Sequence, residues 1–539
     1  MPMRRIFERL RGEPDFPLGR LAFMAALSGL AGGALLPTIA LASGRIAAGQ
    51  VDLQLFFLAL VLAVLSGYAQ HDARKEMAQD CEEALLKLRL RIAERSRHAD
   101  MRWIEETGTP ALYTALAQDT QWIAQAAPLL ILMFRSALAV LLALAWLGWV
   151  SLIGLLVALA FIGVFAFIQA AFVYPGLARK LEDSRLQEWG FYGSLQGLLG
   201  GFKESALNRR RSEDVFHRYA KAAANASAAK RAVGTELADA ASIGYSAIYL
   251  LLIALAVAIP GLDGHAFHLA VAALFLVSEL NPWPTWMAQL APAAAALEAL
   301  FRLEEKLSQA PHAQAPAHAP EPLSPFTRLC LEGVAFSYEE AEGPSPFLLG
   351  PLDLAVNRGE LLFIAGAVGS GKTTLLKLLA GLYRPQAGVF KIDGTALDLS
   401  EQAGYREFFA AVFADFHLPD RCYGMHEADP ARVRDWLEVM GLGGKASFAE
   451  GGFSHRYLSP GQSKRLAFIA AVLEGKPVLL LDDFAGNQDE AFRDRFHREI
   501  LQDIKRQGTT VVAVVNDERY FGLADRVVEL SDGQWVAAP

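Results

Sequence analysis

The chain has 539 residues, of which 53% are hydrophobic and 20% are charged, and its formal net charge is −8. This composition is too apolar for a wholly soluble protein and too charged for one that lies entirely in a membrane, so it indicates one membrane part and one soluble part. Residues 1–307 hold 28 Lys and Arg against 27 Asp and Glu, whereas residues 308–539 hold 22 against 31. An acidic C-terminal part without a basic stripe argues against a nucleic-acid partner.

Six stretches of the N-terminal part are apolar and long enough to cross a lipid bilayer, which takes about 20 residues. They lie near 21–43, 53–70, 127–148, 151–173, 239–260 and 266–288. Lys and Arg gather at the N-terminus and in two long connections, 71–126 and 174–238, which hold eight and eleven of them. Because cytoplasmic connections carry the excess of Lys and Arg, we expect a multi-pass protein with both termini in the cytoplasm.

The two long connections have few glycines and a helical spacing of apolar residues. We therefore expect the membrane helices to continue into the cytoplasm and to turn near 106–112 and 206–214; two separate amphipathic hairpins are the alternative. Residues 308–325 contain five prolines, and a Pro/Ala-rich linker is predicted at 308–327. The domains are thus expected at 1–307 for the membrane part and 328–539 for the soluble part.

A phosphate-binding loop is predicted after the apolar run 361–366. The sequence Gly366-Ala367-Val368-Gly369-Ser370-Gly371-Lys372-Thr373 follows this run directly and opens a helix, which is the strand–GxxxxGK[ST]–helix context of a P-loop. Lys372 is expected to reach the β- and γ-phosphates of ATP, and Thr373 to ligate Mg²⁺. The predicted nucleotide-binding residues here are Gly366, Gly369, Ser370, Gly371, Lys372, Thr373 and Thr374.

A second buried strand, within 477–483, ends in Asp482 and Asp483. Asp482 is the expected second Mg²⁺ ligand, although two carboxylates at a strand end can also cap the next helix. The segment Leu458-Ser459-Pro460-Gly461-Gln462 precedes this strand and opens another helix. By itself it is compatible with a simple helix N-cap.

The last 210 or so residues resemble an ABC ATPase, in which the P-loop, the LSxGQ motif and the Walker B strand (here 477–483) follow in this order. The six-span half is similar to the exporter-type membrane domain. The resemblance implies a membrane all-α domain of six transmembrane helices fused to an α/β P-loop ABC ATPase domain. It also implies a dimer in which ATP lies between the P-loop of one chain and Ser459, Gly461 and Gln462 of the other. The partner is a second copy or a related half-transporter.

The resemblance assigns further positions one by one. Tyr338 matches the aromatic residue that stacks on adenine, and Asp489 matches the D-loop aspartate. Three positions depart from the pattern: Ala414 stands for the Q-loop glutamine, Asp483 for the glutamate after Walker B, and Asn516 for the switch histidine. Asp483, Asn516 and Lys372 are the expected catalytic residues. Because Asp483 is one methylene short and Asn516 cannot carry a proton, ATP hydrolysis is expected to be slow.

The segments 201–219, 405–418, 487–489 and 516–521 resemble the branch of bacterial exporters that carries cyclic peptides, lipopeptide toxins and peptide siderophores. This implies export of a peptide-like or siderophore-like amphiphile across the bacterial inner membrane. Two alternatives stay open. One is a siderophore importer with the same fold, and the other is an ATP-binding regulatory half of a heterodimer with weak catalysis, which Asp483 and Asn516 favour.

Two charges lie within the expected spans. Arg135 and Glu279 fall at comparable depth in the inner half of the bilayer, where ionisable side chains are candidates for function. They are candidate cargo contacts, together with Trp283 and Trp286; a mutual ion pair, or Arg135 reaching the headgroups, is the alternative. The prolines in Asn281-Pro282-Trp283-Pro284 predict a break or kink in the sixth span.

Overall fold

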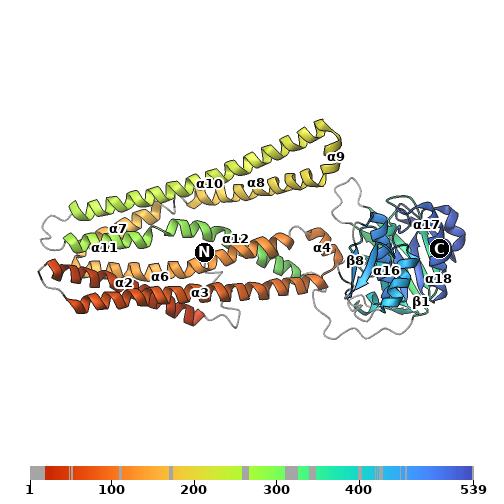
Figure 1. The fold of residues 1–539 in the computed structure, drawn as a ribbon, viewed down its shortest axis with the longest axis horizontal. Coiled ribbons are helices and arrows are strands. Elements are labelled where there is room, and N and C mark those ends of the chain that lie inside the picture. Colours follow the sequence, from red (N-terminus) through yellow and green to blue (C-terminus); the bar gives the residue numbers. More distant parts are fainter. Residues whose placement is uncertain are drawn as a thin grey trace. The chain divides into compact units, whose positions relative to one another are not determined.

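The computed structural model describes residues 18–47, 49, 52–108, 112–168, 171, 174–257, 266–309, 326–338, 347–397, 403–418, 421, 423, 429–449, 451–455 and 458–536. The chain divides into two compact units (Figure 1). The first comprises Met1–Ser96 and Thr107–Gln309, and the second comprises Arg97–Glu106 and Ala310–Pro539. Most of the predicted linker at 308–327 lies outside the described residues.

Helices make up the described part of the first unit. They are α2 (Leu18–Ala47), α3 (Leu53–His98), the π-helix η1 (Thr114–Asp119), α6 (Thr120–Val150), α7 (Leu152–Ile168), α8 (Tyr174–Gly200), α9 (Phe202–Leu207), α10 (Arg209–Val257), α11 (Ala266–Leu280) and α12 (Trp283–Gln309). The short α4 (Met101–Thr107) belongs almost wholly to the second unit.

Two of these helices are much longer than a bilayer requires. Helix α3 has 46 residues and α10 has 49, and at 1.5 Å per residue they are about 70 Å long, against about 30 Å for the hydrocarbon core. α8 and α10 lie side by side and are joined at one end by α9 (Figure 1). The predicted continuation of helices into the long connections is therefore confirmed for α3 and α10, and the predicted turn near 206–214 is present between α9 and α10. Residues 109–111 of the other predicted turn lie outside the described residues.

Three helices of the described chain are long and apolar enough to cross a membrane: Gly19–Ile46, Leu53–His98 and Thr114–Val150. The apolar α7 is shorter, with 17 residues. The spans expected near 239–260 and 266–288 fall on α10 and on α11 with α12, and residues 258–265 between them lie outside the described part. Six spans therefore remain a prediction, whereas several apolar helices suited to a bilayer are observed.

Small residues let α2 approach α6 closely. A Cβ atom added at Gly29 would lie 2.7 Å from the carbonyl oxygen of Arg135, and one at Gly33 would lie 2.7 Å from the side chain of Leu142. Van der Waals contact of this kind is the main source of helix association in a lipid environment. Close packing of α2 thus fixes the backbone of α6 at Arg135.

The predicted break near the end of the last expected span is present. Helix α11 ends at Leu280, residues 281–282 form a turn, and α12 begins at Trp283. Proline removes a backbone donor and clashes with the preceding helical turn, which explains why the helix does not continue through Pro282. The backbone carbonyl of Glu279, just before the break, accepts a hydrogen bond from the Ser136 hydroxyl (2.7 Å).

The second unit is built on a six-stranded sheet in the order β12-β11-β3-β10-β9-β6. Its strands are β3 (Leu361–Ala365), β6 (Phe409–Val412), β9 (Val478–Leu481), β10 (Thr510–Val514), β11 (Arg526–Ser531) and β12 (Gln534–Trp535). All pairs are parallel except that of β11 with β12. A second sheet, in the order β2-β1-β4-β5, is antiparallel and contains β1 (Arg328–Ser337), β2 (Leu348–Asn357), β4 (Ala387–Ile392) and β5 (Thr395–Ala396). β7 (Ala446–Ala449) and β8 (Gly452–His455) form a hairpin.

The central parallel sheet is buried on both faces, as expected for α/β proteins. Alternate residues of β3 enter different cores: Leu361 and Phe363 belong to one cluster, and Leu362 and Ile364 to the other. The first cluster is completed by side chains of α15 (Pro430–Val439), α16 (Pro460–Leu473), α17 (Glu490–Arg495), η4 (Phe496–Ile500) and α18 (Leu501–Arg506). The second is completed by α13 (Lys372–Leu379) and the antiparallel sheet.

A short segment of the N-terminal half completes the second unit. Glu105 lies 2.9 Å from the ammonium of Lys377 on α13 and accepts a hydrogen bond from the hydroxyl of Tyr383 (2.5 Å). Asp100 pairs with Arg384 at 3.7 Å. Lys377 is a buried side chain, and Glu105 supplies the carboxylate that compensates its charge. The second unit is therefore discontinuous in sequence.

Candidate active site

The predicted site residues meet at one edge of the parallel sheet. β3 ends at the P-loop, β10 ends before Asn516, and β9 ends before Asp482 and Asp483. Because these strands are parallel and β10 lies between β3 and β9, all three carboxyl ends open on the same side. Open α/β sheets bind their ligands at this edge.

Lys372 lies inside the loop that is expected to hold phosphate. Its ammonium donates hydrogen bonds to the carbonyl oxygens of Gly366 (2.8 Å) and Ala367 (2.6 Å). The side chain is buried, and this burial lowers the pKa of Lys372, opposed by the nearby Asp482 and Asp483. A buried ammonium held by backbone carbonyls is well placed to exchange these partners for the oxygens of a polyphosphate.

Two glycines give the loop its shape. Gly371, which is the N-cap of α13, has a φ of 102°. Gly366 has a φ of 143°, and a Cβ atom there would lie 2.1 Å from the carbonyl oxygen of Leu530. Both positions lie in the region that favours glycine. Gly369 also has a positive φ (84°), and Ser370 is buried within the same turn.

Thr373 and Asp482 are adjacent, as a shared Mg²⁺ ion requires. The Thr373 hydroxyl donates to a carboxylate oxygen of Asp482 at 2.9 Å, and Asp482 is 3% exposed. A hydroxyl and a carboxylate are oxygen ligands of the kind that Mg²⁺ prefers, and Mg²⁺ at phosphate sites is typically bound by one or two protein oxygens with the substrate. These two residues therefore fit the ion.

Asp483 adopts a left-handed backbone conformation, with a φ of 44°. Its carboxylate packs over Gly486, where an added Cβ atom would lie 2.4 Å from one carboxylate oxygen. Burial raises the pKa of Asp483, while the positive charge of Lys464 opposes that rise. The turn after β9 thus presents a carboxylate whose position depends on the absence of a side chain at residue 486.

Lys464 was not predicted as a site residue from the sequence. It contacts the backbone of both aspartates. This side chain of α16 is 3% exposed, and its ammonium donates to the carbonyl oxygens of Asp482 (3.1 Å) and Asp483 (2.8 Å). An unpaired buried carbonyl is costly, so Lys464 stabilises the tight turn that carries the acidic residues. The only signal in the sequence is that Lys464 lies just before the apolar part of α16, two residues after Gln462.

The LSPGQ segment forms the N-terminus of the 14-residue helix α16. The Ser459 hydroxyl accepts a hydrogen bond from the backbone N–H of Gln462 (3.3 Å), and the Gln462 side chain accepts one from the N–H of Ser459 (3.1 Å). This reciprocal capping box satisfies two free donors of the helix end. The local capping role is therefore present, and the positive end of the helix dipole stands beside Ser459 and Gly461.

The remaining predicted positions differ in how directly they reach the loop. Tyr338 is half-buried beside the P-loop helix, with its hydroxyl 3.1 Å from that of Thr374. Asn516 is exposed at the end of β10, and Ala414 is exposed two residues after β6. Asp489 caps α17 by accepting from the N–H of Phe492 (2.9 Å) and pairs with Arg465 (2.9 Å). These contacts give Asp489 a structural role in this chain.

The two charges predicted in the membrane unit form an ion pair. Arg135 of α6 donates to both carboxylate oxygens of Glu279 on α11, at 3.0 and 3.4 Å, and Glu279 is 7% exposed. The Trp283 indole donates to the Ser136 hydroxyl at 2.9 Å. Trp286 lies half-buried three residues further along α12. Three of the four candidate cargo residues thus belong to one connected cluster that joins α6 to the helix break.

Comparison with known proteins agrees with this architecture. Residues 349–485 match the family model described as ABC transporter. The chain is 42% identical over 207 residues to the ATP-binding protein SyrD of Pseudomonas syringae pv. syringae, a match that covers 38% of this chain and 37% of SyrD. It is 34% identical over 224 residues to the macrolide export ATP-binding/permease protein MacB 1/2 of Paracoccus denitrificans, covering 38% of this chain and 32% of that protein. The chain therefore spans about a third of the length of these curated relatives.

The whole chain also resembles a solved structure. A bacterial Atm1-family ABC exporter with ATP bound aligns over 97% of this chain and 95% of its own, with a TM-score of 0.74 at 16% sequence identity. The chain thus has the fold of this exporter, with a helical unit followed by an α/β unit whose residues 349–485 match the ABC transporter model. This confirms the predicted fold class and the resemblance on which it was based.

Proposed function

We propose that this chain is an ATP-driven exporter that moves a peptide-like or siderophore-like amphiphile out of the cytoplasm. The observation that carries the proposal is the meeting of Lys372, Thr373 and Asp482 at the carboxyl edge of the parallel sheet, with hydroxyl and carboxylate 2.9 Å apart. The exporter fold of the chain supplies the transport context. Similarity to MacB, a macrolide export protein, supports export, and similarity to SyrD supports a bacterial ATP-binding protein. The cargo class follows from the segments that resemble the peptide and siderophore branch.

In the proposed reaction, the P-loop amides and Lys372 bind the phosphates of ATP, and Tyr338 stacks on the adenine. Thr373 and Asp482 would hold Mg²⁺, which would neutralise part of the negative charge of the phosphates. Asp483 orients the attacking water, and Asn516 hydrogen-bonds the γ-phosphate. Asp483 reaches less far than glutamate, and Asn516 carries no charge. ATP hydrolysis is therefore slower than in a site with glutamate and histidine at these two positions.

We further propose that the functional unit is a dimer in the bacterial inner membrane, with both termini in the cytoplasm. One chain contains one P-loop and one LSPGQ segment, so a sandwich of the exporter type needs two chains. Ser459, Gly461 and Gln462 would then face the γ-phosphate bound by the partner chain, where the N-terminus of α16 favours negative charge.

A second candidate is an ATP-binding regulatory half of a heterodimer with weak catalysis. The presence of Asp483 and Asn516 at the two positions that act on the attacking water and the γ-phosphate favours it. The intact P-loop and the intact LSPGQ segment at 458–462, termed the signature segment below, favour the homodimeric exporter. The two candidates differ in whether this chain hydrolyses ATP without another protein.

The experiment that separates them is the ATPase rate of the chain purified alone in lipid nanodiscs, beside Lys372→Ala. A rate above that control supports the self-sufficient exporter. Nucleotide binding without turnover would contradict it and support the regulatory half. Uptake of labelled cyclic peptide or siderophore into inside-out vesicles should depend on ATP; uptake only into right-side-out vesicles would show an importer instead.

A further inference from the structure

The segment Asn487-Gln488-Asp489 contains a buried amide that the proposed reaction does not use. Gln488 is 6% exposed. Its side-chain N–H donates to the carbonyl oxygen of Gly461 at 3.0 Å, and its side-chain oxygen accepts from Arg465 at 2.7 Å. Because a guanidinium only donates hydrogen bonds, the amide oxygen must face Arg465 and the amide nitrogen must face Gly461. The orientation of the side chain is therefore uniquely determined.

Gly461 also packs closely against the backbone of Asn487. A Cβ atom at Gly461 would lie 3.0 Å from the carbonyl oxygen of Asn487 and 3.4 Å from the Gln488 amide. The guanidinium of Arg465 lies 3.5 Å from the ring centroid of Phe492 on α17, which holds it against this segment. Gly461 and residues 487–488 are thus in close contact, with no room for a side chain at position 461.

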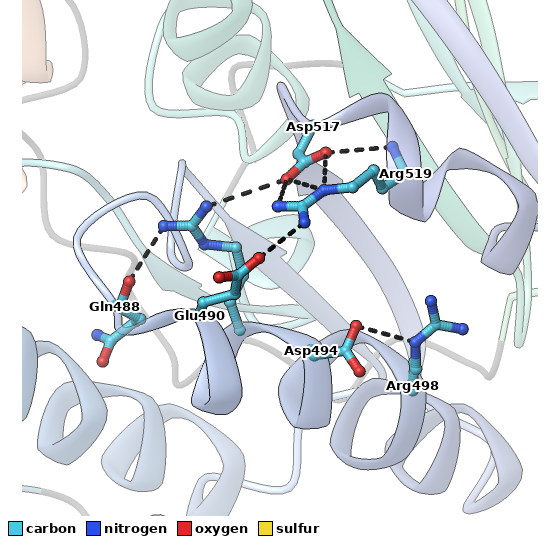
Figure 2. Close-up of polar contacts among 7 residues, drawn as sticks. Gln488, Glu490, Asp494, Arg498, Asp517 and Arg519 are labelled. Atoms are coloured by element: carbon cyan, nitrogen blue, oxygen red, sulfur yellow. Dashed lines mark hydrogen bonds and ion pairs between the residues drawn. The ribbon is translucent and has the colours of Figure 1, made fainter.

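The backbone of Gln488 is connected through Arg493 to Asp517, the neighbour of Asn516 at the switch position. Its carbonyl oxygen accepts from Arg493 at 3.1 Å, and the same guanidinium lies 3.9 Å from the carboxylate of Asp517, which directly follows Asn516. Figure 2 shows Asp517 held in turn by Arg519, which also reaches Glu490 at the start of α17. Asp517 is therefore fixed to the helix that follows Gln488.

We propose that Gln488 is a positioning residue that holds Gly461 and the Asn516–Asp517 segment in one register, so that the signature segment and the switch segment of a chain move together. The inference rests on the proposed function, in which Gly461 faces the ATP of the partner chain and Asn516 faces the ATP of its own chain. A shift at one ATP is then carried to the other through two hydrogen bonds of Gln488 and the ion pair of Arg493 with Asp517.

The test uses Gln488→Glu in the full chain. This change preserves the size of the side chain and the acceptor for Arg465, but it replaces the donor to Gly461 with an acceptor. The expected result is a fall in kcat of about tenfold, since a buried hydrogen bond is lost and a carboxylate then faces a carbonyl. The KM for MgATP should stay within about twofold, because the P-loop contacts are untouched.

The matched control is Gln502→Glu, because Gln502 also donates from its amide to a backbone carbonyl, that of Leu523, at 2.9 Å. It should leave kcat and KM unchanged. An unchanged kcat in Gln488→Glu, or an equal loss from weaker ATP binding, would overturn the proposal.

Hydrogen exchange of the nucleotide-free chain tests the same idea without any ATPase activity. Gln488→Glu should accelerate amide exchange in 458–463 and in 516–521 together, whereas exchange in 366–375 stays as in the unmodified chain. Faster exchange in 458–463 alone would show that the switch segment is not tied to Gln488. If the unmodified chain has no ATPase activity above Lys372→Ala, the proposed function fails, yet this exchange pattern still decides the inference.

Discussion

Two buried lysines of the C-terminal unit and the arginine of the membrane unit differ in the partners that hold their charge. In the C-terminal unit, Lys372 and Lys464 are buried with their ammonium groups on backbone carbonyls. In the membrane unit, Arg135 is paired directly with the carboxylate of Glu279. A cation on carbonyls can accept a phosphate without first losing an ionic partner, whereas a cation in an ion pair must give up its carboxylate. Burial of charge alone therefore does not mark a binding site; Lys372 combines carbonyl partners with a place inside the phosphate-binding loop, whereas Lys464 stabilises a turn.

Breaking the membrane ion pair is expected to have the largest effect on stability. Arg135→Ala leaves the buried Glu279 carboxylate without its cation, which costs about 3–5 kcal/mol. A double change of similar volume, Arg135→Met with Glu279→Leu, should restore most of the loss. The measurement is the thermal unfolding midpoint of the purified full chain, with Arg302→Ala, which breaks an exposed ion pair with Glu298, as a control of small effect.

The same variants test the cargo role proposed for this cluster. If Arg135 contacts cargo, the double variant should fold normally and keep its basal ATPase rate but lose stimulation by cargo. Full stimulation in the double variant would show that the pair serves packing only. An equal fall of basal and stimulated rates in Arg135→Ala would also argue against a cargo contact.

His497 represents a third way of burying an ionisable group, because it stays neutral. It is 3% exposed and stacks on Tyr520 with ring centroids 4.3 Å apart. Burial lowers the pKa of His497 to about 4. Its contribution to stability is therefore complete above pH 6.5 and is lost as the pH falls from 6.5 toward 4. The loss between pH 7.5 and pH 5 is about 2 kcal/mol.

Replacing this histidine should remove the acid sensitivity. His497→Phe retains the ring stack, so its unfolding midpoint should fall less between pH 7.5 and pH 5 than that of the unmodified chain. His417→Phe, at an exposed histidine, is the control and should leave the pH dependence unchanged. An equal pH dependence in all three proteins would contradict the prediction.

Restoring the usual catalytic pair should accelerate hydrolysis. Asp483→Glu combined with Asn516→His is expected to raise kcat by up to about 10²-fold, since a misplaced water-orienting group costs about that much. The comparison is the steady-state ATPase rate in nanodiscs. A double variant no faster than the unmodified chain would show that Asp483 and Asn516 are not the slow elements of the site.

A smaller effect is expected at Gly486. An added methyl group would lie 2.4 Å from the Asp483 carboxylate, which can rotate away at low cost in stability but leaves its working position. Gly486→Ala should therefore lower kcat about tenfold while the unfolding midpoint stays the same. Gly444→Ala, where no atom lies within 4 Å of the new methyl group, is the matched control. Equal rates in both variants would remove the special role of residue 486.

The sequence predicted those features whose residues are neighbours along the chain or directly follow a buried strand. The P-loop, the Asp482–Asp483 pair and the capped LSPGQ helix are of this kind, and the helices that extend beyond the apolar stretches followed from their 3.6-residue spacing. Contacts between distant positions could not be predicted. Arg135 and Glu279 are 144 residues apart; helix depth placed them at one level of the bilayer, but only the packing of α6 on α11 shows that they meet. Lys464 and Gln488 likewise donate to backbone carbonyls 18 and 27 residues away.

The inclusion of Arg97–Glu106 in the second unit has a practical consequence for dividing the chain. A fragment cut at the proline-rich stretch would retain Lys377 and Tyr383 but lose Glu105, which serves both. Exchange of the C-terminal domain with that of a relative would similarly replace these residues while keeping the old acidic partner. The second unit thus includes a decapeptide that lies more than 200 residues before the rest of the unit in sequence. A transferable version of the C-terminal domain should therefore carry this decapeptide through an added covalent linker.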